Sequence, residues 1–197
     1  EGVKILYGRD YYNEEILGLK FKVNAFSFFQ TNIEAIERLY SEALALIPDF
    51  DSKVVYDLYC GTGTISQLMA SKAKKVYGIE IVQDSVDAAI DNAKMNNIDN
   101  CHFICGDVKA KLDEVTEKPD MIVVDPPRMG MHDKVVEMLA SYGIEQILYI
   151  SCNPNTMAMN LEKFSELGYE PVVMKAYDNF PKTKHVESVT LLSRTTL

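Results

Sequence analysis

The chain has 197 residues, with 20 Lys and Arg against 29 Asp and Glu, so its formal net charge is −9. Hydrophobic residues make up 47% and charged residues 25%, values that are ordinary for globular proteins and argue against intrinsic disorder. The length suits one α/β domain, alone or with a small appendage. The acidic balance argues against a surface that holds nucleic acid by bulk charge.

Neither membrane insertion nor secretion is indicated by the sequence. No run of about 18 apolar residues is present, so we expect no membrane span. The first residues include neither a starting Met nor the apolar core of a signal peptide, which suggests a piece of a longer, cytoplasmic protein. The cysteines, none of which forms a C-x-x-C pair, are expected to be reduced thiols without a metal site: Cys60, Cys101, Cys105 and Cys152.

Residues 1–47 are expected to form an N-terminal β-hairpin and a helix that lead into a main domain at 48–197. Two β-like stretches, 3–7 and 19–23, flank a polar turn. A helix is predicted at 31–47, where apolar residues recur at three- and four-residue steps: Ile33, Ile36, Tyr40, Leu44 and Ile47. Ser27 and Gln30 have the spacing of a capping box at the start of this helix.

Strands and helices alternate from residue 53 onward. Strands are predicted at 53–59, 75–81, 102–105, 121–125 and 147–151, and helices at 64–71, 84–96, 132–140 and 154–166. Two further β-rich segments, 171–177 and 187–193, close the chain with no helix between them. This order predicts an α/β fold with a doubly wound, mostly parallel sheet that ends in an antiparallel hairpin. Such sheets bind ligands beyond the carboxyl ends of their strands.

The first three strand ends carry residues suited to a nucleoside cofactor. Gly61 and Gly63 form a tight turn after the first strand, where backbone can approach a ligand closely. A dinucleotide fingerprint needs a third glycine where Ser66 stands. Glu80 after the second strand can accept both hydroxyls of a ribose, and Asp107 follows the third. With Asp57, which precedes the glycines, this series resembles the cofactor half of the Rossmann-like S-adenosylmethionine-dependent methyltransferases; another nucleotide binder with chance acids is the alternative.

The fourth strand ends in Asp125-Pro126-Pro127-Arg128. Two prolines fix the backbone and remove two donors, so a stiff loop is expected. Amino-methyltransferases of this superfamily often carry an aromatic residue after the prolines, where it stacks on the target base. Arg128 in its place argues against an exocyclic amine as the methyl acceptor. The alternative role for Arg128 is a surface ion pair.

Cys152 follows the fifth strand directly before a helix, whose N-terminus is expected to lower the thiol pKa. A small buried apolar residue is the alternative. Carbon 5 of uracil is a poor nucleophile, but a thiolate added to carbon 6 makes an enolate whose carbon 5 can attack a methylsulfonium. A base must then remove the proton of carbon 5. His185 and Glu187 are the candidates, although each could be an ordinary loop or surface residue.

From about residue 21 to its end the chain is similar to the RNA uracil-5-methyltransferases, which make 5-methyluridine in ribosomal or transfer RNA. The motifs that carry the resemblance occur in family order: SFFQTN at 27–32, DLYCGTGT at 57–64, DPPR at 125–128, SCNP at 151–154 and HVE at 185–187. The resemblance implies S-adenosylmethionine as cofactor, Cys152 as nucleophile and Glu187 as base. The cofactor contacts that it and the strand-end pattern suggest are Gln30, Tyr59, Gly61, Glu80, Asp107 and Asp125. Gln30 keeps a rival role in the capping box.

The resemblance also implies an RNA partner, for which we expect ribosomal RNA ahead of transfer RNA, and we expect a monomer. Full-length members usually carry an N-terminal RNA-binding β-barrel and a central RNA-contacting domain, and some bind an iron–sulfur cluster. We therefore interpret this chain as the catalytic domain alone, which should bind RNA weakly. Residues 171–197 nevertheless carry four Lys and Arg against two Asp and Glu. The competing hypotheses are a methyltransferase acting on an amine or small molecule and a cofactor-binding module without catalysis.

Overall fold

The computed structural model describes residues 7–24, 29–47 and 50–195. One sheet contains seven strands in the order β5-β4-β3-β6-β7-β9-β8. Its strands are β3 (Val54–Leu58), β4 (Lys75–Glu80), β5 (Cys101–Cys105), β6 (Met121–Val124), β7 (Gln146–Ser151), β8 (Tyr169–Tyr177) and β9 (Glu187–Arg194). The helices are α1 (Ile33–Leu44), α2 (Thr64–Ala70), α3 (Gln83–Met95), α4 (Val108–Leu112), α5 (Asp133–Ser141) and α6 (Pro154–Glu166), with a short 3-10 helix at Phe50–Ser52.

The sheet confirms the predicted fold class. Strands β3 to β7 pair in parallel, whereas β9 runs antiparallel to both β7 and β8. The closing hairpin therefore places its second strand, β9, inside the sheet and leaves β8 at the edge. Helix α4 and the 3-10 helix were not predicted, since each spans at most five residues and shows no measurable periodicity. No helix among the described residues is long and apolar enough to cross a membrane.

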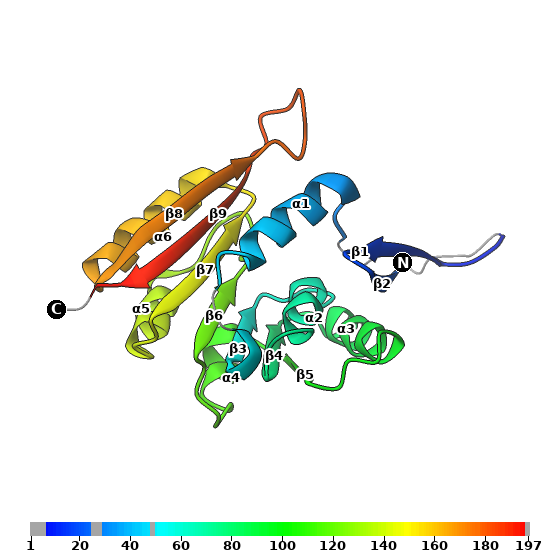
Figure 1. Ribbon diagram of the computed structural model, residues 1–197, viewed down its shortest axis with the longest axis horizontal. Coiled ribbons are helices and arrows are strands. Elements are labelled where there is room, and N and C mark those ends of the chain that lie inside the picture. Colours follow the sequence, from blue (N-terminus) through cyan, green and yellow to red (C-terminus); the bar gives the residue numbers. More distant parts are fainter. Residues whose placement is uncertain (1–6, 25–28, 48–49, 196–197) are drawn as a thin grey trace.

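Two hydrophobic cores cover the two faces of the sheet. One contains Val55 and Val123 together with residues of α1, α2 and the N-terminal hairpin. The other contains Tyr56 and Val124 together with residues of α4, α5 and α6. Because successive side chains of a strand point to opposite faces, all five residues of β3 are buried. Figure 1 shows α1 and α6 on opposite sides of the strands β7 and β9.

The N-terminal hairpin is present, but its first strand was wrongly predicted. β2 (Leu19–Asn24) pairs with β1 (Tyr11–Ile16). Of the predicted range 3–7, Tyr7 lies outside any strand and 3–6 lie outside the described residues. The connection is Leu17-Gly18, and both residues have positive φ, 49° and 82°. These angles match the two-residue turn that suits the twist of a hairpin. The polar composition of β1 hid the strand from the sequence pattern.

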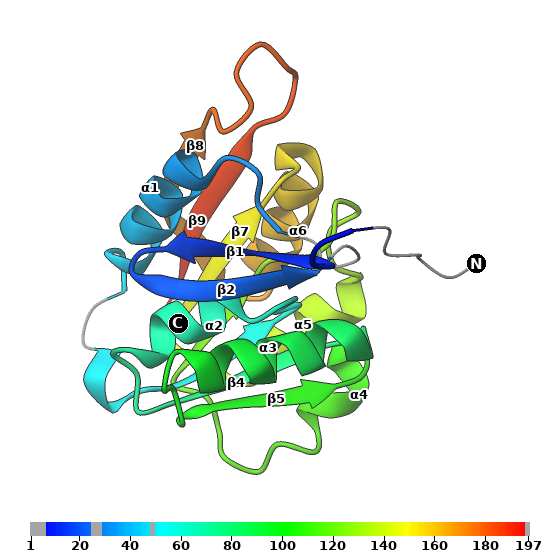
Figure 2. The ribbon, with the colours of Figure 1, turned by 90° about the vertical axis from the view of Figure 1, so that its right-hand side faces the viewer.

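Two side-chain amides, one on α3 and one at its C-cap, hydrogen-bond the hairpin to the main domain. Asn96 exchanges two hydrogen bonds of 2.8 Å with the backbone N–H and C=O of Lys20. Asn92 Oδ1 accepts a third, also 2.8 Å long, from the N–H of Lys22. The two asparagines are one helical turn apart, which matches the two-residue spacing along β2 of the backbone groups that they bond. These backbone groups at the open edge of β2 therefore have hydrogen-bond partners. Figure 2 shows the hairpin lying across α2 and α3.

Helix α1 begins two residues later than predicted and has a different cap. Asn32 is the N-cap, and its Oδ1 accepts a hydrogen bond of 3.3 Å from the N–H of Ala35. Gln30 therefore precedes the cap and cannot be the third residue of a capping box, while Ser27 lies outside the described residues. Asn32 Nδ2 also donates to the carbonyl of Asn179, 2.8 Å away, which ties the start of α1 to the loop after β8.

Glu42 links α1 to the edge strand β8, and we expect this link to weaken in acid. Its carboxylate accepts hydrogen bonds from Lys175 (2.9 Å), Tyr177 (3.0 Å) and Arg38 (3.0 Å). These donors, Lys175 first, lower the pKa of Glu42 to about 2. Since the pKa is depressed in the folded state, the stabilisation is present above the unfolded pKa of about 4.3 and is lost as the pH falls toward 2. The difference in melting temperature between the wild type and Glu42→Gln should thus shrink below about pH 4.3; a constant difference would contradict this.

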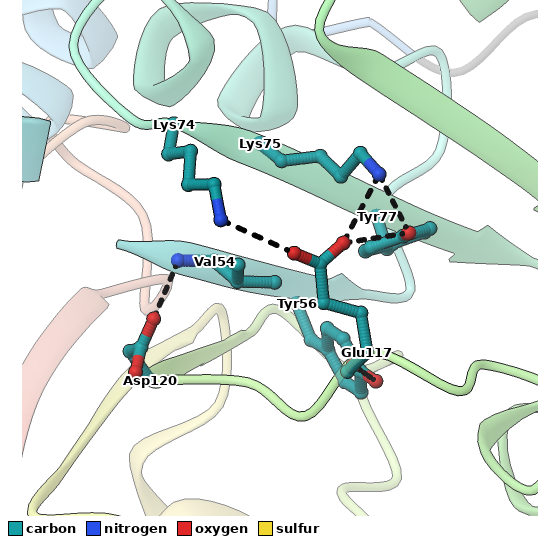
Figure 3. A network of polar contacts seen from close by, with 7 residues as sticks. All are labelled: Val54, Tyr56, Lys74, Lys75, Tyr77, Glu117 and Asp120. Atoms are coloured by element: carbon teal, nitrogen blue, oxygen red, sulfur yellow. Dashed lines mark hydrogen bonds and ion pairs between the residues drawn. The ribbon is translucent and has the colours of Figure 1, made fainter. Parts of the chain in front are cut away.

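The amino-terminal edge of the sheet is closed by a network around Glu117 (Figure 3). Glu117 accepts hydrogen bonds from Lys75 (3.0 Å) and Tyr77 (3.2 Å), and it pairs with Lys74 at 3.5 Å. The Lys75 hydrogen bond is the largest cause that lowers the pKa of Glu117. These contacts join the loop before β6 to the start of β4. They are structural, and the residues singled out for chemistry lie at the opposite edge.

Candidate active site

The carboxyl ends of the parallel strands meet at one edge of the sheet. Strand β9 begins at this same edge because it runs antiparallel, and Ser188 pairs with Ser151 at the end of β7. Glu187 is thereby brought beside the segment that carries Cys152, although 34 residues separate them in the chain. The topology alone accounts for this meeting of two distant motifs.

The loop after β3 has an unusual backbone. Tyr59, Gly61 and Gly63 all have positive φ, at 65°, 54° and 77°. A Cβ at Gly63 would lie 2.8 Å from the Phe103 ring, so this glycine is required by packing. A Cβ at Gly61 would meet nothing within 4 Å, so its backbone faces open space. Tyr59 pays about 1–2 kcal/mol for its left-handed conformation, and such strain concentrates at functional sites.

Glu80 holds the glycine loop in place. Its Oε2 accepts a hydrogen bond of 3.1 Å from the N–H of Gly61, and its Oε1 accepts one of 2.9 Å from the N–H of Val82. Each carboxylate oxygen keeps a second lone pair, so Glu80 can still accept hydroxyl donors.

Asp107 caps the unpredicted helix α4. Its Oδ1 accepts a hydrogen bond of 3.2 Å from the N–H of Ala110, and its side chain is exposed. Burial, and then the charge of nearby Asp107, raise the pKa of Tyr59 to about 12. Asp107 therefore lies close to the first strand end as well as capping a helix, and its second oxygen remains available.

Asp57 is a fully buried carboxylate with one unused oxygen. Its Oδ2 accepts a hydrogen bond from the hydroxyl of Ser66, the residue that replaces the third glycine of a dinucleotide fingerprint. Its Oδ1 has no hydrogen-bond partner among the described residues. Burial is the main cause that raises the pKa of Asp57 to about 7. A buried acceptor of this kind is suited to a ligand that brings a donor or a positive charge.

Asp125, Glu187 and Tyr40 extend this acidic cluster. Burial first, and then the charges of Glu187 and Asp57, raise the pKa of Asp125 to about 8. Burial also raises the pKa of Glu187, which is 5% exposed. Tyr40 of α1 is buried among these groups: burial, and then the charges of Asp125, Asp57 and Glu187, raise the pKa of its phenol. Gln30 lies within hydrogen-bonding reach of the Tyr40 hydroxyl.

Sequence reasoning placed Tyr40 only on the apolar face of a helix. Periodicity identifies the buried face correctly but does not say which groups that face meets. Burial opposes the ionised form of all three carboxyls of this acidic cluster, Asp57, Asp125 and Glu187. The pKa values of about 7 for Asp57 and about 8 for Asp125 leave these two partly protonated near neutral pH in the free protein.

Cys152 lies at the same edge, half-buried, but its pKa was wrongly predicted. Burial, and then the charges of Glu187 and Asp125, raise the pKa of the thiol, while Arg128 opposes them. Helix α6 begins at Pro154, and its cap Asn153 already bonds the N–H of Asn155 at 3.2 Å. Cys152 precedes this cap, so burial, with the charges of Glu187 and Asp125 added to it, outweighs the helix end. The thiol needs a base or a higher pH to become nucleophilic.

The loop that carries Arg128 is held by α6. The Arg128 carbonyl accepts hydrogen bonds from Asn153 Nδ2 (2.9 Å) and from the Thr156 hydroxyl (3.2 Å). The Asn160 amide bonds both backbone groups of Met131, with Oδ1 at 2.9 Å and Nδ2 at 2.8 Å. These hydrogen bonds add to the two prolines expected to stiffen the loop. The sequence did not predict these contacts, because Thr156 and Asn160 are polar residues within a helix and match no motif.

Arg128 also decides which group can act as the base. Arg128 Nη1 lies 3.1 Å from Nδ1 of His185. Since a guanidinium only donates, Nδ1 must be the acceptor, and a neutral His185 carries its proton on Nε2. In that state neither ring nitrogen can take another proton while the contact persists. Of the two candidate bases, this geometry favours Glu187.

Comparison with known proteins identifies the family. A family profile described as tRNA (Uracil-5-)-methyltransferase matches residues 1–195. The chain belongs to this family. An uncharacterized RNA methyltransferase of Caldanaerobacter subterraneus is 50% identical over 194 residues, which are 98% of this chain and 43% of that protein. One from Clostridium acetobutylicum is 50% identical over 189 residues, 96% of this chain and 41% of that protein.

Among solved structures, this member of the family resembles the tRNA (uracil-54, C5)-methyltransferase of Pyrococcus abyssi, determined in complex with S-adenosyl-L-homocysteine. The TM-score is 0.80 at 28% identity, and the match covers 94% of this chain and 45% of that chain. The expected family, its S-adenosylmethionine-dependent class and its fold are thereby confirmed. The chain spans less than half the length of the relatives named here.

Within the part of the chain that the structure describes, no three His, Cys, Asp or Glu side chains gather in a way that could hold a metal ion. The cysteines at the candidate site and beneath it are unpaired thiols, namely Cys60, Cys101, Cys105 and Cys152.

Proposed function

We propose that this chain is the catalytic domain of an enzyme that transfers a methyl group from S-adenosylmethionine to carbon 5 of a uridine in RNA. The observation that carries the proposal is the meeting of Cys152 and Glu187, from separate motifs, at one sheet edge beside a buried acidic cluster. A thiol and a carboxylate are the nucleophile and base that methylation at carbon 5 requires. Methylation of an amine requires no thiol.

The polar groups at the ends of the first strands of the sheet suit S-adenosylmethionine. The unpartnered Oδ1 of Asp57 fits a ligand that carries a positive charge or an N–H donor. Glu80 retains lone pairs for ribose hydroxyls, and Gly61 leaves its side of the loop open. We assign cofactor contacts to Gln30, Tyr59, Gly61, Glu80, Asp107 and Asp125, and we add Asp57 to them. When bound, this cofactor supplies an electrophilic methyl group.

The side chains act in the following order. Cys152 loses its proton to a neighbouring carboxylate, and its sulfur adds to carbon 6 of uracil, which pushes the carbon 5–carbon 6 electron pair into an enolate. The enolate uses that pair to bond the methyl carbon at carbon 5; the bound cofactor would give up this methyl group with its carbon–sulfur bond broken, the electron pair of that bond staying on the sulfur of S-adenosylhomocysteine. Glu187 then removes the proton of carbon 5, the double bond re-forms, and the carbon 6–sulfur bond breaks to release the Cys152 thiolate.

The RNA class stays a proposal. We predicted ribosomal RNA ahead of transfer RNA, while the family description and the name of the P. abyssi enzyme both specify tRNA. Both RNA classes should therefore be assayed side by side. Monomeric state, a cytoplasmic location and a boundary between a lead-in segment at 1–47 and the methyltransferase domain at 48–197 also remain predictions.

The test is tritium release from RNA that contains [5-³H]uridine. Methylation at carbon 5 expels this hydrogen, whereas methylation of an amine or a ribose leaves it in place. We expect release that depends on S-adenosylmethionine and falls by at least about 10⁴-fold in Cys152→Ala. Cys101→Ala, a thiol change at the amino-terminal end of β5, is the matched control and should keep its activity. Methyl incorporation without tritium release would refute methylation at carbon 5. Cofactor binding without any incorporation, in the full-length protein, would favour a non-catalytic module.

A further inference from the structure

The loop between β8 and β9 connects the edge of the sheet to the proposed base. It spans residues 178–186 and extends well beyond the strands in both views (Figures 1 and 2). It carries Lys182, Lys184 and His185, and it ends directly before Glu187. Arg128, from the loop after β6, reaches it through the 3.1 Å contact with His185. Arg128 and the three loop residues thus supply four nitrogen-bearing side chains on the two segments that adjoin Asp125 and Glu187 in the chain.

At the tip of this loop, Lys182 occupies a left-handed backbone position that favours glycine. The N–H of Thr183 donates to the carbonyl of Phe180 at 3.1 Å, which closes a four-residue turn. Pro181 occupies the second position, and Lys182 in the third has a φ of 67°. This is the pattern of a type II turn, whose third position prefers Gly or Asn. Retaining a long cationic side chain there, against the local backbone preference, suggests that the side chain has a use.

The base of the loop is fixed, while its lysines point away from partners. The Thr183 hydroxyl donates to the carbonyl of Phe180 at 2.7 Å and accepts from the N–H of His185 at 3.1 Å. The rings of Phe180 and His185 meet edge to face, with centroids 6.3 Å apart. Lys182 and Lys184 are exposed and take part in none of the ion pairs among the described residues. Their charges are therefore presented to solvent on an ordered support.

We propose that Arg128, Lys182, Lys184 and His185 form a phosphate rim that contacts the RNA backbone beside the target uridine. The inference rests on the proposed function, which makes RNA the substrate. A uridine flipped out of its stack needs its flanking phosphates held while the base enters the site. In a chain of net charge −9, RNA is repelled by most of the surface, so a local cationic border is needed at the entrance.

The phosphate rim is placed for this task. Burial raises the pKa of both the Cys152 thiol and the Glu187 carboxyl, and the charge of Arg128 opposes the rise at both, so this charge lies close to the reacting groups. His185, with Nδ1 occupied by Arg128, presents Nε2–H as a donor. Both lysines carry compact charges on long stems, which suit phosphate contacts without sequence readout. The rim would thus add affinity, while sequence choice lies elsewhere.

The test is the salt dependence of RNA binding by this chain, measured without cofactor as fluorescence anisotropy of a labelled, uridine-containing stem-loop RNA. Each phosphate contact in a single strand adds roughly 0.7 to the slope of log affinity against log salt. Lys182→Gln with Lys184→Gln should lower that slope by about 1.4 and weaken binding roughly tenfold at 0.1 M salt. The matched control, Lys72→Gln with Lys118→Gln, makes the same charge change at the opposite edge of the sheet and should leave the slope unchanged.

Lys182→Gly separates this role from folding. Glycine relieves the left-handed backbone at the turn, so the melting temperature should stay equal or rise while the salt slope falls by about 0.7. Unchanged slopes in both rim variants, or equal losses in the control, would overturn the phosphate rim. If the full-length protein still releases tritium from RNA in that case, the proposed function stands without the rim. If the full-length protein releases none, the function itself fails.

Discussion

Glu187→Gln is expected to leave the protein covalently joined to its RNA. Glutamine occupies the same volume but cannot take the proton of carbon 5, so the last step stops after the methyl group has been added. The bond between Cys152 and carbon 6 then persists, and turnover falls by roughly 10²–10⁴-fold or more. A band that carries both protein and RNA should survive a denaturing gel, and it should contain the methyl label while retaining the tritium of carbon 5.

The matched controls assign each step to one side chain. Cys152→Ala should give neither product nor a covalent band, because no bond to carbon 6 forms. Glu162→Gln makes the same change on the exposed face of α6 and should behave like the wild type. His185→Ala tests the rival base and should keep tritium release, although its affinity for RNA should fall. Continued tritium release by Glu187→Gln, together with its loss in His185→Ala, would reverse the assignment.

The fold could be predicted from the sequence because apolar strands and amphipathic helices alternate regularly along the chain. Helix α6 has the predicted bounds, and the parallel strands lie within two residues of theirs. The first hairpin strand was misplaced because its alternation is mostly polar. The hairpin is attached through its second strand, β2, whose backbone bonds two asparagines one helical turn apart and 70 or more residues away in the chain. No local pattern encodes such a contact.

The candidate site was predictable to the level of motifs but not of electrostatics. Cys152, Asp125 and Glu187 follow from their motifs, and topology brings them to one edge. The predicted direction of the thiol pKa shift was wrong because a helix end is visible in the sequence, whereas the burial of the thiol and the carboxyls of Glu187 and Asp125 beside it result from tertiary structure. Tyr40 was read as a core residue for the same reason. Its ring belongs to the core, but its hydroxyl belongs to the acidic cluster.

Because the acidic cluster holds protons, we expect cofactor binding to be coupled to proton release. The pKa values of Asp57 and Asp125 are raised to about 7 and about 8, chiefly by burial. A cation bound beside them favours their ionised forms, so protons must leave when S-adenosylmethionine binds. Affinity should therefore rise by about tenfold per pH unit for each proton released below pH 7, and level off above pH 8. Calorimetry in two buffers of different ionisation enthalpy counts the protons directly.

The free protein should show the opposite trend in stability. A carboxyl whose pKa is raised by folding costs stability as the pH rises from its unfolded value of about 3.9 through its folded value, about 7 for Asp57. Asp57→Asn removes that cost, so its melting temperature relative to the wild type should increase between pH 5 and pH 8. The same variant should bind the cofactor roughly 10- to 100-fold more weakly, because a charged acceptor is lost.

Comparing two ligands separates the charges responsible. S-adenosylhomocysteine keeps the ammonium group of S-adenosylmethionine but lacks its sulfonium charge. If the ammonium group is the charge that ionises Asp57, binding of either ligand should release the Asp57 proton. In Asp57→Asn this proton release should be absent for both ligands. If the sulfonium charge acts on Asp125, only S-adenosylmethionine should release the second proton. Equal affinity at pH 6 and pH 8, with no proton release for either ligand, would mean that the buried carboxylates do not face the cofactor. The acidic cluster would then be a structural feature of the core.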